Sequence, residues 1–256
     1  MGRIIAVANQ KGGVGKSTTS INLASCLAAE GKRVLAIDMD PQGNTTSGLG
    51  LDKNNQKYTV YDLLLDEVSI EECIVSEVFE GLDVLPSNVD LSGCEIELIG
   101  VSRKEYILKD NVDQIKNQYD FIIIDCPPSL SMLTINAMTT ADTVLVPSQC
   151  EYYALEGLSQ LIYTISLVKE RLNPNLEIEG VVFTMYDART NLSLQVVENV
   201  KGYLKQNIYK TIIPRNVRLA EAPSHGLPIN IYDSRSAGAE AYRMLAAEVI
   251  GNADAY

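Results

Sequence analysis

The sequence at positions 11–18 is Lys11-Gly12-Gly13-Val14-Gly15-Lys16-Ser17-Thr18, and this stretch decides the fold. An apolar run at residues 4–8 leads into it and a helical pattern follows it, which predicts a strand, a glycine-rich loop and a helix. In such a loop the backbone N–H groups surround an anion at the helix N-terminus. Lys16 would supply charge for the β- and γ-phosphates, and the Ser17 hydroxyl is suited to bind Mg²⁺ directly. All eight residues are therefore expected to bind a nucleoside triphosphate with magnesium.

A second lysine, Lys11, makes this loop unusual. Gln10 stands where the standard pattern G-x-x-x-x-G-K-[ST] has its first glycine. Two lysines in eight residues are costly unless both meet negative charge, and Lys16 already serves the phosphates of its own loop. One solution is that Lys11 contacts a triphosphate held by a facing subunit, so that the nucleotide joins two copies. The spacing K-G-G-V-G-K-[ST] resembles the deviant Walker A loop of the ParA/MinD/nitrogenase-iron-protein superfamily, in which such a contact is a family feature.

Length and composition favour one domain over residues 1–256, because 46% apolar and 21% charged residues suit a sizeable α/β core. No apolar run approaches the ~18 residues of a membrane span, and the N-terminus lacks the layout of a signal peptide. We therefore expect a cytoplasmic protein that does not bind membranes. The five cysteines lack C-x-x-C spacing, which argues against a structural metal and predicts reduced thiols, most of them small core residues.

The net charge of −12 argues at first against nucleic acid as a partner. The charge is unevenly distributed, however: residues 184–220 contain six basic and two acidic residues, a balance of +4, which leaves −16 for the remainder. Charge counting supports equally a basic face and an ordinary solvated helix with its loops. The basic residues are Arg189, Lys201, Lys205, Lys210, Arg215 and Arg218.

Residues 33–37 predict a short buried strand that completes a strand-helix-strand unit, so the sheet is expected to be parallel, with its ligand at the carboxyl ends of the strands. This strand leads into the segment Asp38-Met39-Asp40-Pro41-Gln42-Gly43-Asn44. Asp40 heads a loop that is suited to move, and its carboxylate could orient or deprotonate an attacking water or hold a Mg²⁺-bound water. The alternative is that Asp38 and Asp40 only cap a turn. The segment resembles switch I of the ParA family, where the aspartate at the position of Asp40 assists water attack.

The run Phe121-Ile122-Ile123-Ile124-Asp125 predicts a central strand that brings Asp125 beside the phosphate loop. This is the form of a Walker B strand, in which Asp125 would contact magnesium through water. The following loop, with Pro127 and Pro128, resembles switch II. Cys126 in that loop is expected to be a packing residue.

The remaining pattern alternates strands and helices, which predicts a doubly wound, mainly parallel sheet with helices on both faces. Pro214 offers a flat apolar face to a purine ring, and nearby groups such as Asn216 could read the edge of the base, without separating adenine from guanine. The expected helices are 59–65, a stretch after Leu91, 155–168, 192–204 and 239–250; the expected strands are 82–86, 143–146, 180–184 and 208–213.

Five ordered matches extend along the chain: K-G-G-V-G-K-S-T, D-M-D-P-Q-G-N, F-I-I-I-D-C-P-P-S-L, C-E-Y-Y-A-L-E-G-L and I-P-R-N-V-R-L-A-E-A-P-S-H-G. Together they resemble a chromosomal ParA ATPase of the Soj type. The resemblance implies an ATPase that uses ATP and Mg²⁺, forms a homodimer on ATP, binds double-stranded DNA non-specifically on the nucleoid, and is released when a ParB-like partner stimulates hydrolysis. Arg189 and Arg218 match arginines that contribute to DNA binding in that family; Lys201, Lys205 and Arg215 are further candidates.

Other functions need features that are weak here. A MinD-like cell-division positioning ATPase would need a basic amphipathic C-terminal helix, but residues 239–250 contain one arginine and two glutamates. A nitrogenase-type protein would need suitably placed cysteines, and a metabolic ligase or tyrosine kinase a substrate pocket or tyrosine-rich tail. A structural role without turnover is the remaining alternative. The single histidine, His225, is expected to be a loop residue with a packing or hydrogen-bonding role.

Overall fold

Eight strands form one sheet in the computed structural model of the chain, which describes residues 2–151, 154–187, 200 and 208–253. The order is β3-β4-β2-β5-β1-β6-β7-β8, and each neighbouring pair is parallel except β3 and β4. The strands are β1 (Arg3–Val7), β2 (Val34–Asp38), β3 (Val75–Phe79), β4 (Leu82–Leu85), β5 (Phe121–Asp125), β6 (Thr143–Gln149), β7 (Glu177–Tyr186) and β8 (Ile208–Pro214). The predicted doubly wound, mainly parallel fold is confirmed.

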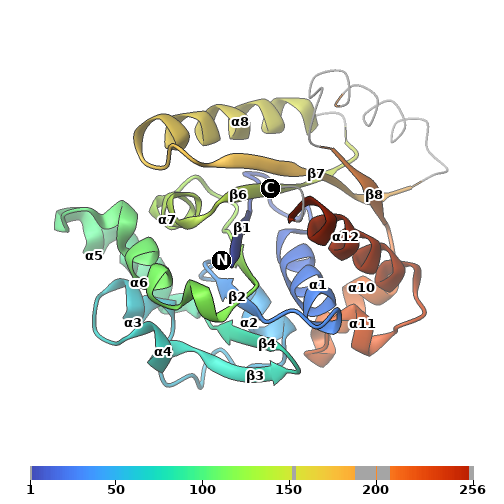
Figure 1. Cartoon of the computed structure of the whole chain (residues 1–256), viewed down its shortest axis with the longest axis horizontal. Coiled ribbons are helices and arrows are strands. Elements are labelled where there is room, and N and C mark those ends of the chain that lie inside the picture. The colour runs from blue at the N-terminus through green and yellow to red at the C-terminus, as the bar shows by residue number, and fades with distance from the viewer. Residues whose placement is uncertain (1, 152–153, 188–199, 201–207, 254–256) are drawn as a thin grey trace.

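Helices cover both faces of this sheet (Figure 1). The α-helices are α1 (Lys16–Ala29), α2 (Asn44–Gly48), α3 (Val60–Leu64), α4 (Ile70–Cys73), α5 (Cys94–Glu97), α6 (Ile107–Ile115), α7 (Met132–Thr140), α8 (Ala154–Arg171), α10 (Val217–Glu221), α11 (Ile229–Tyr232) and α12 (Ala237–Ala253). Short 3₁₀ helices are η1 (Val89–Gly93), η2 (Leu98–Gly100), η3 (Lys104–Tyr106), η4 (Lys116–Gln118) and η5 (Ala222–His225).

The central strands are buried on both sides, which explains why they read as continuous apolar runs. On one face, side chains from β1, β2 and β5 pack with α3, α6, α7 and α8 in one apolar cluster. On the other face, alternate residues of the same strands pack with α1, α11 and α12 in a second cluster. Two cores on one sheet hold the strand ends in a defined arrangement.

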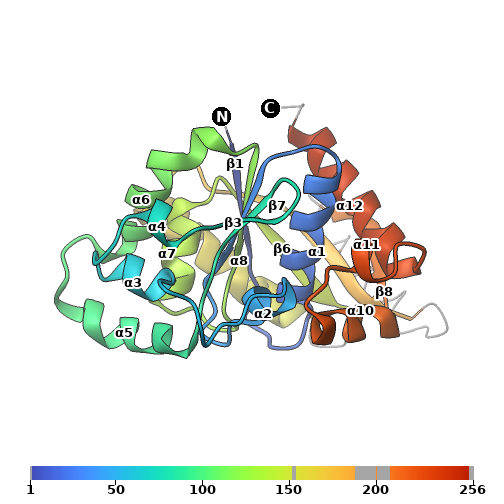
Figure 2. The same ribbon diagram turned by 90° about the horizontal axis from the view of Figure 1, so that it is seen from below.

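Strand β5 lies between β1 and β2 and brings three functional segments to one edge. In register, Asp125 is the partner of Val7 on β1 and of Asp38 on β2. The carboxyl ends of all three strands therefore meet beside the loop that precedes α1. Figure 2 shows α2 and α10 along this edge of the molecule.

Most predicted elements are present, with longer bounds for β6, β7 and α8 than expected. Several elements were not predicted from the sequence, namely β3, α2, α4, α6, α7, α10 and α11. β3 is a short edge strand with half-exposed residues, so it has no clear alternation, and α7 is nearly all buried, so it has no amphipathic pattern. The predicted helix at 192–204 lies outside the described residues, apart from Val200.

Candidate nucleotide-binding site

The loop between β1 and α1 has the backbone of an anion-binding loop. Gly13 and Gly15 have φ angles of 75° and 88°, in the left-handed region that favours glycine. α1 begins at Lys16, and no side chain caps its N-terminus. The first N–H groups of this 14-residue helix are therefore available to a negatively charged ligand.

Two adjoining cavities open beside this loop. One, of about 410 Å³, is lined by the loop and by Asp40; the other, of about 210 Å³, is lined by Pro214, Asn216 and Tyr242. Gly15, Thr18 and Met185 line both cavities. A charged compartment beside an apolar one suits the phosphates and the base of a nucleotide.

Asp125 is fully buried at the end of β5 and accepts hydrogen bonds from three hydroxyl groups. Ser20 donates at 3.0 Å and Thr45 at 2.7 Å, and Ser17 donates as well. Asp125 thus lies beside the phosphate loop, as predicted, and the contact with Ser17 is an addition from the structure. This arrangement holds the Asp125 carboxylate behind the Ser17 hydroxyl, which lines the phosphate cavity and is an oxygen ligand that a hard cation such as magnesium accepts.

Asp38, also fully buried, lies at the end of β2. One of its oxygens accepts from the N–H and hydroxyl of Thr46, at 2.8 and 2.7 Å, and the other from the N–H of Asp40 at 3.2 Å. It therefore anchors α2 and the loop before it, which makes Asp38 a positioning residue.

Burial raises the pKa of Asp125 to about 6, against the opposing effect of its hydrogen bonds. Burial and the charge of Asp125 raise the pKa of Asp38 to about 7. Burial also lowers the pKa of Lys16, although the carboxylates of Asp125 and Asp40 favour its charged form. The site thus contains several incompletely compensated charges, as expected for a place where a metal and phosphates bind.

Asp40 lines the phosphate cavity and is only 6% exposed. Its carboxylate accepts the N–H of Gln42 at 2.9 Å, and its carbonyl oxygen accepts the hydroxyl of Ser87 at 2.9 Å. The segment is a loop, as predicted. In this structure Asp40 does cap a turn, but it also borders the cavity where an attacking water would have to stand.

Lys11 has an anionic partner within its own chain. Its ammonium group pairs with the carboxylate of Glu151, which follows β6, and both side chains are more than 40% exposed. The carbonyl oxygen of Lys11 accepts a hydrogen bond from the Lys16 ammonium at 3.1 Å. The premise that Lys11 lacks a partner in its own subunit is therefore wrong for this conformation, while the contact with a facing subunit stays a prediction.

Pro214 and Asn216, which were predicted to meet the base, line the smaller cavity. The Asn216 side-chain oxygen accepts the N–H of Leu219 at 3.3 Å and caps α10, which fixes the side chain beside the cavity. Arg215, a DNA-binding candidate, also lines this cavity.

The predicted basic segment is described only in part. Arg189, Lys201 and Lys205 lie outside the described residues. Arg218 is about half exposed and forms ion pairs with Glu221 at 2.9 Å and with Asp233 at 3.4 Å. Those two carboxylates offset the charge that Arg218 presents to solvent.

Several residues of the site were not predicted from the sequence. The hydroxyl residues Ser20, Thr45 and Thr46 hold the two buried aspartates, and Glu151 holds Lys11. The spacing of Ser20 from Ser17, nearly one helical turn, is the only local signal that could have identified one of them.

The cysteines and the histidine have packing roles. All five cysteines are buried, and burial raises the pKa of Cys150 to about 11 and of Cys94 to about 12. The His225 ring stacks on Tyr232 with 4.9 Å between centroids. Among the residues that the structure describes, no group of three or more His, Cys, Asp or Glu could hold a metal by itself.

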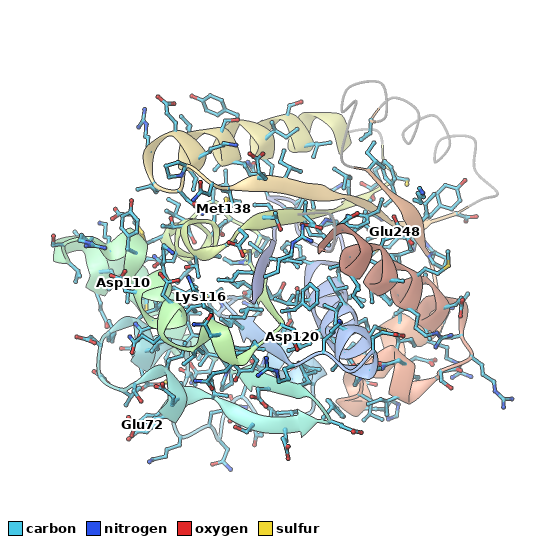
Figure 3. All side chains as sticks on the ribbon, in the orientation of Figure 1. Glu72, Asp110, Lys116, Asp120, Met138 and Glu248 are labelled. Carbon is cyan, nitrogen blue, oxygen red and sulfur yellow. The ribbon has the colours of Figure 1, made fainter. Side chains whose placement is uncertain are left out.

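Another cavity, of about 500 Å³, lies at the opposite, amino-terminal ends of the strands. Lys109 and Lys116 on its wall pair with Asp113 at 2.9 and 2.7 Å, and Figure 3 shows Lys116 there. Its charges largely satisfy one another, and ligands of open parallel sheets bind at the other edge. The nucleotide site is therefore assigned to the carboxyl edge.

The fold and the site define a nucleotide-binding ATPase domain of the P-loop class, and the family model described as "AAA domain" matches residues 2–178. The chain is 58% identical to the sporulation initiation inhibitor protein Soj of Bacillus subtilis, over 98% of this chain and 100% of that protein. It is 52% identical to the chromosome partitioning protein ParA of Myxococcus xanthus, over 98% and 88% of the two chains. The chain belongs to the ParA family of chromosome-partitioning ATPases.

Solved structures of other ATP-binding proteins share this fold. A cobyrinic acid a,c-diamide synthase from Mycobacterium smegmatis, with bound ATP analogue and magnesium, has a TM-score of 0.87 and 38% identity, over 98% of this chain and 95% of that one. The cell division ATPase MinD of Pyrococcus furiosus has a TM-score of 0.81 and 29% identity, over 98% and 99% of the two chains. In the described part of the chain, no helix combines the length and the apolar character that crossing a membrane requires.

Proposed function

We propose that this protein is a chromosome- and plasmid-partitioning ATPase that hydrolyses ATP to ADP and phosphate with Mg²⁺. The observation that carries the proposal is the meeting of the glycine-rich loop, Asp40 and Asp125 at one sheet edge, beside a second, apolar cavity. The relatives named as Soj and ParA support a role in partitioning.

Different residues bind the different parts of ATP. The N–H groups from Gly12 to Thr18 and the ammonium of Lys16 bind the phosphates, while Pro214 and Asn216 meet the base. Ser17 would hold Mg²⁺ directly, Asp40 and Asp125 would hold it through water, and the bound ion would supply positive charge to the phosphates. The hydroxyls that donate to Asp125 keep it oriented toward this position.

Asp40 positions the attacking water. It is the only carboxylate among the residues that line the phosphate cavity in the structure, so it can accept the proton of a water in line with the γ-phosphate. Because its carboxylate is anchored by the N–H of Gln42, its orientation is set before the substrate arrives.

In this proposal the dimer forms when Lys11 leaves Glu151 and contacts the triphosphate of the facing subunit. Its ion pair with Glu151 is exposed, and exposed pairs contribute only about 0–1 kcal/mol. A triphosphate held by a facing subunit offers more negative charge than one carboxylate, so Lys11 leaves Glu151 when ATP is present. The homodimer is thus dependent on ATP.

The ATP-bound dimer binds double-stranded DNA without sequence preference through the segment that carries Arg189, Arg218, Lys201, Lys205 and Arg215. Two subunits combine their phosphate contacts in one binding event, which makes binding dependent on nucleotide. A ParB-like protein stimulates hydrolysis and returns the protein to monomer. The proposed place of action is the cytoplasm, on the nucleoid.

A MinD-like cell-division positioning ATPase is the alternative function. It would place an amphipathic C-terminal helix on a membrane. Here α12 packs on α1 and β8, and Glu248 on it accepts the N–H groups of Lys210 and Thr211 at 2.9 and 2.8 Å (Figure 3). These contacts favour a structural role for the described part of this helix.

Two measurements test the proposed function together. The mass in solution should double when ADP is replaced by a non-hydrolysable ATP analogue with Mg²⁺. Phosphate release from ATP should rise when duplex DNA and a ParB-like protein are added. A mass that stays monomeric with the analogue, or the absence of turnover under all these conditions, would contradict the proposal and favour a structural role.

Magnesium affinity is expected to rise with pH. Asp125 and Asp38 have raised pKa values, so each is partly protonated below about pH 6 and 7, and a proton must leave before the site carries its full negative charge. Between pH 7.5 and 5.5 the Mg²⁺ affinity of the ADP complex should fall at least about tenfold beyond the change for free ADP. Calorimetric titration measures this, and Asp125→Asn should reduce the excess.

DNA binding is expected to depend on two arginines. Replacing Arg189 and Arg218 by alanine should weaken binding to all duplex sequences alike and flatten the salt dependence by about 0.9 for each DNA phosphate that is no longer neutralised. ATP hydrolysis without DNA should stay near normal. Filter binding at several salt concentrations measures both effects.

Arg103→Ala is the matched control for this variant. Arg103 is exposed and paired with Asp110 much as Arg218 is paired with Glu221, but it lies far from the basic segment. If the double variant binds DNA as tightly as the parent protein does, the basic segment is only a solvated face.

A further inference from the structure

The negative charge of the chain is concentrated in one region. Residues 58–102, here called the acidic lobe, contain eleven acidic residues and no lysine or arginine. Nine of the eleven are exposed, and none forms an ion pair with a described residue. The acidic residues are Asp62, Asp66, Glu67, Glu71, Glu72, Glu77, Glu80, Asp83, Asp90, Glu95 and Glu97.

The sheet places this lobe far from the basic segment. β3, which belongs to the lobe, is one edge strand, and β8, beside which Arg215 and Arg218 lie, is the other. Figure 1 shows α3, α4 and α5 at the end of the molecule away from β8, and Figure 3 shows Glu72 on that side. The acidic lobe and the described part of the basic segment therefore lie at opposite edges of the sheet.

An apolar groove lies within the acidic end, between α3, η2 and α6. Its volume is about 280 Å³, at the lower limit of about 300–1,000 Å³ that is usual for small-molecule sites, so it suits one or two apolar side chains. Apolar residues make most of its wall. Two carboxylates line it: Asp66, which forms no ion pair with a described residue, and Asp110, which pairs with Arg103 at 3.5 Å. The lining residues are Leu64, Leu65, Asp66, Leu98, Val101, Ile107, Asp110 and Asn111.

Exposed apolar residues lie close in the chain to Leu98 and Val101, which line this groove. Ile96 and Ile99, on α5 and η2, are 74% and 69% exposed, and Val101 on the groove wall is 43% exposed. Single exposed apolar residues need no explanation, but several within six residues of chain beside a groove are typical of an interaction surface.

We infer that this groove binds a positively charged amphipathic segment of a partner protein. Apolar side chains of the segment would enter the groove, and its lysines or arginines would face Asp66, Glu95 and Glu97. The charge complementarity decides among occupants: DNA and anionic membranes are negative and are repelled. A second copy of the chain in a two-fold contact would bring two acidic lobes together, and their like charges would repel.

This inference goes beyond the proposed function and does not depend on it. No residue lines both the groove and either part of the nucleotide site, so a partner can be bound whether or not the nucleotide is turned over. Because the groove and the basic segment are at opposite edges of the sheet, such a partner and DNA can be bound at the same time.

A peptide-binding experiment with the full chain tests the inference. The probe is a fluorescent peptide of about 15 residues made of lysine and leucine, with the leucines spaced so that they share one face of a helix. Its fluorescence anisotropy is measured as the protein concentration is raised. Replacing Ile96 and Ile99 together by asparagine should weaken binding at least about tenfold, because apolar anchors dominate such interfaces. Asp66→Asn should weaken it several-fold at low salt; residue 66 has a φ of 61°, which asparagine tolerates.

Matched controls separate the groove from general charge attraction. Ile231→Asn with Met244→Asn changes two similarly exposed residues on α11 and α12, and it should leave binding unchanged. A peptide of the same composition without amphipathic spacing should bind at least about tenfold more weakly. Circular dichroism and unchanged basal ATP turnover show that the variants are folded.

Three results would overturn the inference: equal binding of the scrambled peptide, unchanged binding by the Ile96→Asn and Ile99→Asn variant, or a fall in oligomer mass caused by that variant. The last result would assign the groove to a second copy of the chain. If the parent protein shows no ATP turnover, the proposed function is contradicted, but the inference about the groove is not affected.

Discussion

Replacement of Asp40 by alanine is expected to slow ATP hydrolysis by about 10²–10⁴-fold while ATP binding and ATP-dependent dimer formation persist. General-base assistance acts mainly on the transition state, which is why the loss should be in turnover and not in affinity. The side chain borders the phosphate cavity and is already oriented by the N–H of Gln42, so little rearrangement separates it from a bound water. Single-turnover hydrolysis, measured with light scattering for the dimer, separates these effects.

Two variants distinguish chemistry from the turn that Asp40 also caps. Asp40→Asn keeps an oxygen that can accept the N–H of Gln42 but cannot take a proton, so it should be as slow as Asp40→Ala. Asp52→Ala is a matched control, because Asp52 likewise accepts the N–H two residues further on, from Asn54 at 3.0 Å, on an exposed loop. Recovery of turnover in Asp40→Asn would assign Asp40 to the turn alone.

Replacement of Lys11 by alanine is expected to abolish ATP-dependent dimer formation while some nucleotide binding remains, since Lys16 and the loop backbone still hold the phosphates. If each Lys11 meets the triphosphate of the facing subunit, a dimer of the variant lacks two such interactions. Each charge-assisted hydrogen bond contributes about 1.5–3 kcal/mol. Together they correspond to a change of about 10²–10⁴-fold in the dimerisation constant. Sedimentation with a non-hydrolysable ATP analogue measures this.

Glu151→Gln is the decisive control for the role of Lys11. If Lys11 acts only through its ion pair with Glu151, removing the carboxylate should reproduce the loss seen in Lys11→Ala. If Lys11 acts on the facing nucleotide, Glu151→Gln releases it and dimers should form at the same or lower ATP analogue concentration. The pair is exposed, so the gain should be no more than about fivefold. A full ATP-dependent dimer of Lys11→Ala would exclude the contact between subunits.

The sequence by itself determined the local parts of this protein. The loop at 11–18 needs glycine at φ angles of 75° and 88°, and its strand and helix follow from residues within a few positions. The buried strands β1, β2 and β5 read as apolar runs because both of their faces are covered, and β2 and β5 end at Asp38 and Asp125, which the site uses. Periodicity and turn chemistry act over short distances, so they can be read from a chain without its fold.

Only the tertiary structure decided which of these parts meet. The insertion of β5 between β1 and β2 depends on packing between residues far apart in the chain, and it is what brings Asp125 beside Asp38 and the phosphate loop. The pairing of Lys11 with Glu151 joins residues 140 positions apart, which no local pattern encodes. The groove beside Ile99 likewise requires α3, η2 and α6 to pack together. Such contacts arise when a folded chain closes long loops around a shared core, and their energies depend on the whole arrangement rather than on any one segment.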